Sequence, residues 1–402
     1  MSTTSFCYHT LGTTNYQYLT TKYEGKQVYL HMEKHPGKQT CAKCKSPAVI
    51  QKGKIYREIK TLPIGDKGLV LSLHLHRLEC KACGTTALEE LEVANAKKHY
   101  SKKLAAWVLD LLPLATIRDV ARITGLSWDQ VKEIDKTYLQ KHYAEVAVQQ
   151  LHRIAIDEFY IGQRLQYVTL VTDLDSGHIV FAGKGKDGSC LKPFFKKLKR
   201  NHVRLEAVAM DMGKAYIAAV HHYLPGTPIV FDHFHVVKLV NSKLDELRRQ
   251  VTQQADAPTL PVKKGLRWIL LKNPEHLTAQ QKPLLAQLLE LNTPLMQAYL
   301  LKEQFRSFWD YATKDQALAF IQQWLQEVRT LGFPCMTALA TSIEAHLDGM
   351  LAYFDHPISS GKMEGLNNKI ATLLKKAYGC RDLDYFMLKV KALHRSRYAL
   401  VG

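Results

Sequence analysis

The order of apolar segments between residues 153 and 231 is the strongest constraint on the fold. Three consecutive strand-like runs are followed by an alternation of helical and strand-like segments. The expected strands are 153–160, 165–173, 178–183, 205–210 and 228–231, and the expected helices between them are 189–200 and 213–223. Three strands in succession and then alternating strands and helices are typical of a mixed sheet. The sequence therefore predicts an α/β fold here.

The composition favours a nucleic-acid partner. The chain has 402 residues, 46% of them hydrophobic, which is enough for a sizeable core and more than one domain. Its 55 Lys and Arg against 37 Asp and Glu give a net charge of +18, which attracts polyanions. A cationic membrane-surface protein is the alternative. We see no secretory signal and no apolar run of about 18 residues, and we therefore expect a cytoplasmic protein without membrane contact.

Changes in composition and the positions of turn-forming and helix-breaking residues divide the chain into five segments. Residues 233–350 look wholly helical, with breaks expected at Pro258, Pro261, Pro274, Pro283 and Pro294. The expected boundaries are 1–95 and 96–150 for two N-terminal domains, 151–240 for the first part of the α/β core, 241–355 for an all-helical insertion, and 356–402 for the last helices of the core.

Two Cys-x-x-Cys pairs predict a structural zinc site. The pairs are Cys41–Cys44 and Cys80–Cys83, and the residues between them alternate apolar and polar side chains like strands. Four thiolates complete a tetrahedral zinc shell, so His74 and His76 nearby are not expected as ligands. Unliganded thiols or a redox pair are the alternatives.

Residues 116–138 have the pattern of a helix-turn-helix. Gly125 supplies the tight turn, and Ser127 can cap a second helix whose apolar face contains Val131 and Ile134. The second helix of such a pair enters the DNA major groove. The candidate DNA contacts are Trp128, Gln130 and Lys132, which would face or flank the bases, Arg118 and Arg122, which would face phosphates, and Ser127. An ordinary helical hairpin is the alternative.

Three acidic residues form the candidate catalytic site. Asp157 and Asp211 each close an apolar run expected as a strand, and Glu364 lies at the expected start of a late helix. Carboxylates that meet repel one another and favour a shared divalent cation, and oxygen ligands suit Mg²⁺. Two such ions activate a nucleophile and stabilise a leaving oxygen in phosphoryl transfer.

Further polar residues surround these three. Glu158 is expected on the opposite face of its strand. Asp232 also follows a strand, either as a helix N-cap or as support for the site, together with His235. His233 is expected to be structural. The candidate DNA-backbone contacts near Glu364 are Lys362, Asn368, Lys369, Lys375, Lys376 and Arg381, and Asn367 is a further polar neighbour on the same helix.

The order of these motifs resembles that of the DDE transposases of bacterial insertion sequences, specifically the family with an N-terminal zinc-binding domain. The resemblance covers about 40 to 400 and is most specific in Glu364-Gly-Leu-Asn-Asn-Lys-Ile370, followed by Tyr378-Gly-Cys-Arg381. It implies a zinc ribbon, a helix-turn-helix and a ribonuclease-H-like core interrupted by an all-helical insertion. His233 departs from it, because a more basic residue is expected there.

The resemblance also implies an activity. Asp157, Asp211 and Glu364 would hold two Mg²⁺ or Mn²⁺ ions, with Asp157 shared between them. The protein would be a DNA transposase that binds terminal inverted repeats, cleaves at the element's ends and joins the freed 3′-OH to target DNA. Pairing two ends implies a homodimer or larger assembly on DNA, in the bacterial cytoplasm near the nucleoid.

Three alternatives remain at this point. The first is a domesticated, non-catalytic DNA-binding protein, although all three acids are present. The second is a nuclease of the same fold that cuts without joining, and the third is a purely structural zinc protein. Trp268, Trp309 and Trp324 are expected to be core residues rather than stacking platforms for bases.

Overall fold

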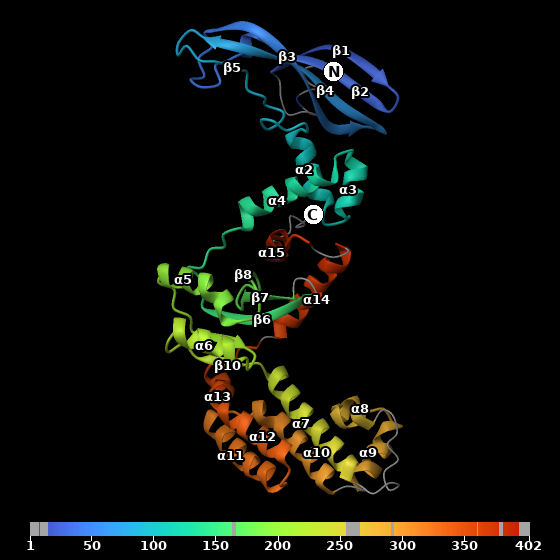
Figure 1. Cartoon of the computed structure of the whole chain (residues 1–402), viewed down its shortest axis with the longest axis vertical. Coiled ribbons are helices and arrows are strands. Elements are labelled where there is room, and N and C mark those ends of the chain that lie inside the picture. The colour runs from blue at the N-terminus through green and yellow to red at the C-terminus, as the bar shows by residue number, and fades with distance from the viewer. Residues whose placement is uncertain are drawn as a thin grey trace. The chain divides into compact units, whose positions relative to one another are not determined.

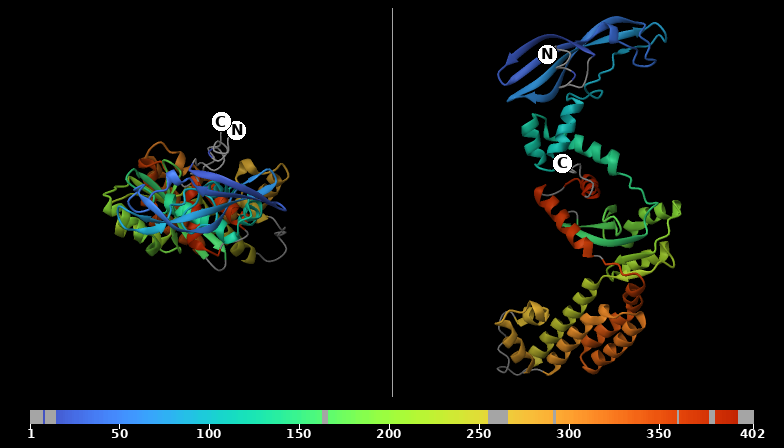
Figure 2. Two further views of the ribbon diagram at one scale, coloured as in Figure 1. Left: turned by 90° about the horizontal axis from the view of Figure 1, so that it is seen from above. Right: turned by 180° about the vertical axis from the view of Figure 1, so that it is seen from behind.

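The chain forms two compact units in a computed structural model (Figures 1 and 2). The structure describes Tyr8 and residues 15–162, 166–254, 266–290, 293–359, 361–377 and 381–393. The first unit is built on residues 1–144 and the second on residues 145–375, with shorter C-terminal pieces in each. No helix in these described ranges is long and apolar enough to cross a membrane.

A twisted sheet forms the first half of unit 1. Its order is β1 (Tyr16–Glu24), β2 (Gln27–Lys34), β4 (Lys67–Cys80) and β3 (Val49–Ile64), and the short β5 (Thr86–Leu88) also pairs with β4. Only the β2–β4 pair among these is parallel. One face of the sheet is covered by Val93 and Ala94 and buries Met32, Ile59 and Leu71. A single 3₁₀ turn, η1 (Pro36–Lys38), follows β2.

Three short helices complete unit 1, and their sequence signals are confirmed. They are α2 (Lys102–Leu111), α3 (Ile117–Thr124) and α4 (Trp128–Tyr143). Gly125 takes a left-handed φ of 68° after α3, where glycine carries no steric penalty. Ser127 caps α4, because its side chain accepts from the Gln130 backbone while the Gln130 side chain accepts from the Ser127 backbone. Val120, Val131 and Ile134 are buried between the helices.

A mixed five-stranded sheet organises unit 2, as the sequence predicts. Its order is β10 (Ile229–Phe231), β9 (Ala207–Met210), β6 (Arg153–Gly162), β7 (Gln166–Asp173) and β8 (Ile179–Lys184). The meander β6–β7–β8 is antiparallel, whereas β9 and β10 run parallel to β6. Helical crossovers precede both parallel strands, since a parallel pair cannot be closed by a tight turn.

Helices cover both faces of this sheet. On one face, η2 (Gly188–Leu191), α5 (Lys192–Arg200) and α6 (Lys214–Tyr223) pack on a core that includes Ile154, Ile156 and Val208. On the other face, α14 (Gly361–Lys376) and α15 (Leu383–Ala392) pack on Ala155, Ala207 and Ala209. The small side chains of this second face leave room for α14 to lie close to the strands.

The remaining helices of unit 2 form the all-helical part. They are α7 (His233–Gln254), α8 (Leu266–Leu271), η3 (Pro274–His276), α9 (Gln281–Glu290), α10 (Thr293–Arg306), η4 (Ser307–Asp310), α11 (Lys314–Thr330), α12 (Pro334–Ala345) and α13 (Leu347–Asp355). Helix α7 packs against α10 and α12, and α11 packs against α12 (Figure 2). Helix α7 continues through residues 240–241, which is the expected boundary between the α/β core and the insertion. Pro283 and Pro294 lie in the first turns of α9 and α10, and Pro258 and Pro261 lie outside the described residues.

The tryptophans of this region behave differently from one another. Trp324 is 2% exposed, and its indole nitrogen donates to the Leu301 carbonyl at 2.8 Å, as expected for a core residue. Trp309 is partly buried and stacks on His233. Trp268 is 63% exposed, so the expectation of a core position is wrong for this residue. Helix α8 has only six residues and buries Ile269 and Leu270 instead.

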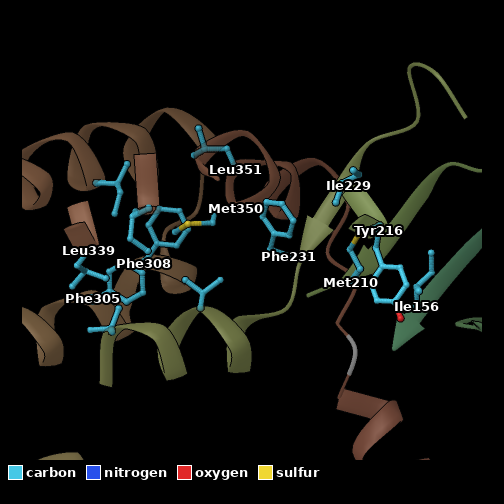
Figure 3. Close-up of a cluster of buried hydrophobic side chains, with 14 of the residues drawn as sticks. Ile156, Met210, Tyr216, Ile229, Phe231, Phe305, Phe308, Leu339, Met350 and Leu351 are labelled. Atoms are coloured by element: carbon cyan, nitrogen blue, oxygen red, sulfur yellow. The ribbon is translucent and has the colours of Figure 1, made fainter. Parts of the chain in front are cut away.

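Phe231 joins the sheet to the helical part. It ends β10 and lies beside Met350 and Leu351 of α13 in the buried cluster of Figure 3. A Cβ at Gly349 would lie 2.3 Å from the Phe231 ring, which is closer than any carbon contact tolerates. Gly349 is therefore required for α13 to reach the sheet.

We predict that Gly349→Ala destabilises unit 2. The added methyl group overpacks the contact with Phe231, and overpacking costs about 1–3 kcal/mol. Urea denaturation followed by circular dichroism measures the change in the free energy of unfolding. Gly365→Ala is the matched control, because a Cβ there meets nothing within 4 Å and alanine favours a helix. Equal stability of the two variants would contradict this account of the junction.

Candidate functional site

Three aspartates lie level with one another where the parallel strands end. The register pairs Ala155 of β6 with Ala209 of β9, so two residues later Asp157 is level with Asp211. It also pairs Phe231 of β10 with Met210, which makes Asp232 level with Asp211. Parallel strands present their carboxyl ends at one edge of a sheet. The register therefore brings together side chains that are far apart in the sequence.

Asp157 closes the apolar run of its strand, but it lies within the strand and not at its end. Strand β6 continues to Gly162, and Asp157 pairs with Leu170 of β7 within the antiparallel meander. Only the parallel pairing with β9 stops before it. Asp157 thus has a partner strand on one side and an open position on the other, beside Asp211.

All three aspartates belong to the face covered by α14 and α15. Side chains alternate along a strand, and Ala155, Ala209 and Val230, each two residues before an aspartate, are buried in that face. Helix α14 buries Met363, Leu366 and Ile370 in the same core. One turn of α14 is therefore adjacent to the aspartates.

Asn367 makes this contact directly. Its side-chain amide donates to Oδ2 of Asp157 at 2.8 Å, while the Glu158 backbone N–H donates to Oδ1 at 2.8 Å. The other amide atom, Oδ1 of Asn367, is buried without a hydrogen-bond partner among the described residues. Glu364 lies one helical turn before Asn367 on α14, and its side chain is outside the described residues.

Burial and mutual repulsion disfavour the ionised form of the carboxyl groups in this site. Burial raises the pKa of Asp157 above its usual value, the hydrogen bonds from Asn367 and Glu158 oppose this, and the nearby charge of Asp211 raises the pKa further. Glu158 also has a raised pKa, first from burial and then from Asp211. Negative charge thus accumulates in a partly buried place, which favours a cation.

The donor atoms fit a hard divalent cation. Asp157 and Asp211 offer carboxylate oxygens, and the orphaned Oδ1 of Asn367 adds a further acceptor close by. The Gly213 backbone N–H donates to Oδ1 of Asp211 at 3.0 Å and orients that carboxylate. A Cβ on Gly213 would approach the same oxygen to 2.8 Å, so glycine keeps the turn beneath Asp211 open. Oxygen donors of this kind suit Mg²⁺ or Mn²⁺.

The segment after β10 contributes a second group of polar side chains. Asp232 is 8% exposed and accepts from the Phe234 backbone N–H at 3.3 Å, in agreement with an N-cap role. Nε2 of His235 lies 3.9 Å from Asp232 Oδ2, and the positive charge of His235 would lower the pKa of Asp157. His235 is thus close to both carboxylates.

His233 faces the helical part instead. Its ring stacks on Trp309 with centroids 4.3 Å apart and meets Tyr353 edge-on at 4.4 Å. Burial lowers the pKa of His233 to about 4, so it is neutral at physiological pH. These contacts agree with the structural role expected for this residue.

Four cysteines of unit 1 form a candidate zinc centre. Sγ of Cys41 lies 3.7 Å from Sγ of Cys83, Sγ of Cys44 lies 3.5 Å from Sγ of Cys80, and all four sulfurs are within 4.8 Å of one another. Tetrahedral zinc with Zn–S bonds of about 2.3 Å separates its sulfurs by roughly 3.8 Å. The cluster therefore fits zinc. In the described part of the chain it is the one group of three or more metal-ligand residues found this close together.

The hairpin of β3 and β4 explains how distant cysteines meet. Val49 pairs with Cys80, so the residues before β3 and after β4 emerge at the same end of the hairpin. Each pair closes a similar turn, in which Lys45 and Gly84 take left-handed φ values of 61° and 67°. Sγ of Cys83 lies 3.4 Å from the Thr85 hydroxyl, and hydrogen bonding with Thr85 lowers the pKa of Cys83 to about 6, which favours the thiolate that zinc binds. His76 is instead occupied by Gln39 and Glu89.

The predicted DNA contacts of the helix-turn-helix are at its surface. Arg118, Arg122 and Ser127 are exposed, and Trp128 is 47% exposed with the Lys132 ammonium over its ring. Gln130 is partly buried and uses its side-chain oxygen in the cap of α4. In the free protein this oxygen already accepts a hydrogen bond from the Ser127 backbone, which was not expected of a base-contacting residue.

The candidate contacts near Glu364 lie along α14 and just after it. Asn368, Lys369, Lys375 and Arg381 are exposed, and Lys376 is partly buried. The side chain of Lys362 and residues 378–380 are outside the described residues. Asn367 was expected only as a polar neighbour of Glu364 on a DNA-contacting helix, and its contact with Asp157 was not predicted, although its spacing of three from Glu364 places both on one side of the helix.

Several known proteins are similar to this chain. The transposase for insertion sequence element IS1001 of Bordetella parapertussis is 32% identical over 340 residues, covering 84% of each chain. The transposase for insertion sequence element IS1557 of Mycobacterium tuberculosis (strain CDC 1551 / Oshkosh) is 28% identical over 382 residues, covering 85% of this chain and 82% of its own. Among solved structures, the Drosophila P element transposase strand transfer complex is 13% identical with a TM-score of 0.39, covering 74% of this chain and 91% of that chain.

Two family descriptions match consecutive parts of the chain. Residues 89–139 match the helix-turn-helix domain of transposase family ISL3, which agrees with α2, α3 and α4. Residues 154–390 match the transposase domain of the same family, from the first strand of the mixed sheet to the last helix. The match includes strand β6 with Asp157, Asp211 directly after strand β9, and the helix that carries Glu364. The chain belongs to transposase family ISL3.

Proposed function

We propose that this transposase binds the terminal inverted repeats of an insertion sequence and catalyses metal-dependent cleavage and strand transfer of DNA. The observation that carries the proposal is the alignment of Asp157 and Asp211 on adjacent parallel strands beneath α14. Asn367 of α14 already contacts Asp157 at 2.8 Å, one turn after Glu364. Asp157, Asp211 and Glu364 are the proposed catalytic residues.

The proposed fold of the catalytic part is ribonuclease-H-like. Three antiparallel strands followed by two parallel strands, with helices on both faces, support this reading. Residues 151–240 and 356–402 would form this core, and residues 241–355 would be its insertion. Residues 1–95 would be a zinc-ribbon domain and residues 96–150 the helix-turn-helix domain.

Each residue of the site would have its own role in phosphoryl transfer. Two divalent cations, when bound by the three carboxylates, supply Lewis acidity toward the attacking and leaving oxygens of the phosphate. Asn367 and the Glu158 backbone hold the Asp157 carboxylate in one orientation, and the Gly213 backbone does the same for Asp211. His235, held near Asp232, would offer a positive charge or a hydrogen-bond donor to a phosphate oxygen. The protein thus contributes mainly by positioning and by neutralising charge.

The DNA would be recognised by unit 1 and by basic side chains near the site. Recognition of the inverted repeats would use α4 in the major groove, with Trp128 and Lys132 at the base edges and Arg118 and Arg122 on phosphates. Lys362, Asn368, Lys369, Lys375, Lys376 and Arg381 would contact the backbone of the DNA close to the carboxylates. A homodimer or larger assembly would pair the two ends.

A nuclease that cuts without joining remains the second candidate. The same carboxylates serve both reactions, because water and a DNA 3′-OH are alternative nucleophiles at one site. The similarity to transposases of insertion sequences over most of both chains favours joining. Formation of strand-transfer products separates the two.

We predict that Glu364→Gln abolishes cleavage and joining but preserves DNA binding. Loss of one carboxylate ligand removes several kcal/mol of stabilisation from the transition state, which is roughly a thousandfold in rate. The assay uses labelled duplexes from the ends of the element, a target plasmid and Mg²⁺. Glu290→Gln is the control, since that exposed glutamate lies at the end of α9. Full activity of Glu364→Gln would overturn its proposed role.

We also predict one zinc ion per chain in the cysteine cluster. Cys83→Ser should lose the zinc and the order of the adjoining end of the sheet, because a structural zinc site contributes directly to folding. Mass spectrometry under native conditions measures the metal content. Cys190→Ser keeps all four ligands and should retain the zinc. Equal zinc content in both variants would show that the metal is held elsewhere.

A further inference from the structure

Helix α5 has two faces of opposite character. Its apolar face is fully buried against the mixed sheet and is formed by Leu191, Phe194, Phe195 and Leu198. Its other face is exposed and carries four cations at helical spacing, Lys192, Lys196, Lys199 and Arg200. These four residues are called the α5 basic stripe below. Arg204, also exposed, follows in the next loop.

Nearby acidic groups do not neutralise the stripe. Residues 188–205 contain no Asp or Glu. At one end Asp187 is occupied by Ser189, whose backbone N–H donates to it at 2.8 Å, and at the other Glu206 lies 3.7 Å from His152. None of the four cations forms an ion pair with any residue in the described part of the chain. An uncompensated group of like charges attracts a polyanion.

Lys197 differs from the four cations of the stripe, because its side chain takes part in the packing of the helix. Its ammonium group donates to the Val146 carbonyl at 2.7 Å, and the side chain is partly buried. Lys197 therefore has a structural role. Among the described residues, none gives the cations of the stripe a contact of this kind, so their charge is available to a ligand.

The length of the stripe matches a nucleic-acid backbone. Lys192 to Arg200 spans eight helical steps, or about 12 Å at 1.5 Å per residue. Each strand of duplex DNA presents one phosphate per roughly 3.4 Å of its axis. Laid along the duplex axis, the stripe therefore spans the rise of about three to four base pairs, where its cations can reach phosphates of one strand.

The stripe is held on a rigid support. Phe195 contacts Tyr223 of α6 with ring centroids 5.6 Å apart. A Cβ on Gly188, at the start of η2, would lie 2.5 Å from the Ala215 carbonyl oxygen, so this segment is in close contact with α6. Helix α5 covers the face of the sheet opposite to the one that α14 covers. A ligand on the stripe is thus distinct from the DNA proposed to lie at the carboxylates.

We propose that the α5 basic stripe is a second DNA site, which binds duplex DNA of any sequence through the phosphates of one strand. The inference rests on the proposed function only in taking DNA as the polyanion. It adds a contact that is separate from both the helix-turn-helix and the catalytic face. An acidic surface on a second copy of the chain would be the competing partner for such a stripe.

The test compares two full-length variants with the wild type. One replaces all four cations by glutamine (K192Q, K196Q, K199Q, R200Q), and the other keeps the charge (K192R, K196R, K199R). Fluorescence anisotropy gives the Kd for a duplex of random sequence over a range of NaCl concentrations. The slope of log K against log salt is negative, and each lost phosphate contact reduces its magnitude by about 0.9. We expect the glutamine variant to lose about three units of slope and at least tenfold in affinity at low salt, and the arginine variant to match the wild type.

Each outcome has a defined meaning. Unchanged melting temperatures, expected for exposed side chains without ion pairs, show that both variants fold. An unchanged salt slope in the glutamine variant, with the wild type still binding DNA, overturns the second site and leaves the proposed function standing. A shift in oligomeric state by light scattering with an unchanged slope assigns the stripe to a second copy and also overturns it. A wild type that binds no duplex DNA contradicts both proposals.

Discussion

The repulsion between two neighbouring carboxylates is the constraint on which the site depends. Parallel pairing of β6 and β9 makes Asp157 level with Asp211, and the packing of α14 partly excludes water from them. Burial and like charge both raise the pKa of Asp157. Such an arrangement costs stability in the free protein unless a cation, a proton or a donor offsets it. Asn367 offsets part of the cost, and two divalent ions would offset the rest while they bind phosphate oxygens.

The rest of unit 2 keeps this alignment in place. The small residues Ala155, Ala207 and Ala209 bring α14 close to the strands, so that Asn367 reaches Asp157. On strand β10, Phe231 packs against Gly349 of α13. It also lies beside Met350 and Leu351 (Figure 3), and these contacts fix the helical part to the sheet. The helical part is therefore attached one residue before Asp232 and close to the carboxylates. Strand β10 therefore links the attachment of the helical part to the geometry of the site.

Much of the secondary structure and the cysteine cluster could be predicted from residue patterns, because the signals for them are local in the sequence. The strands and helices of residues 153–231, the turn at Gly125 and the cap at Ser127 depend on short-range chemistry, and the structure confirms them. The cysteine cluster follows from ligand type and spacing. Contacts between distant elements were not predictable. Asn367 reaches Asp157 across 210 residues, and Gly349 is needed only because Phe231 packs against it. Trp268 is exposed because a six-residue helix buries only its neighbours.

Direct measurement of metal binding tests the central claim, that Asp157 and Asp211 form a cation site. Electron paramagnetic resonance of Mn²⁺ titrated into the DNA-bound protein measures how many ions are bound and how tightly. The account predicts that the wild type binds Mn²⁺ and that Mg²⁺ displaces it. Asp157→Asn and Asp211→Asn should both lose this binding, and Glu290→Gln should retain it. Wild-type Mn²⁺ binding in the two aspartate variants would contradict the assignment of the site.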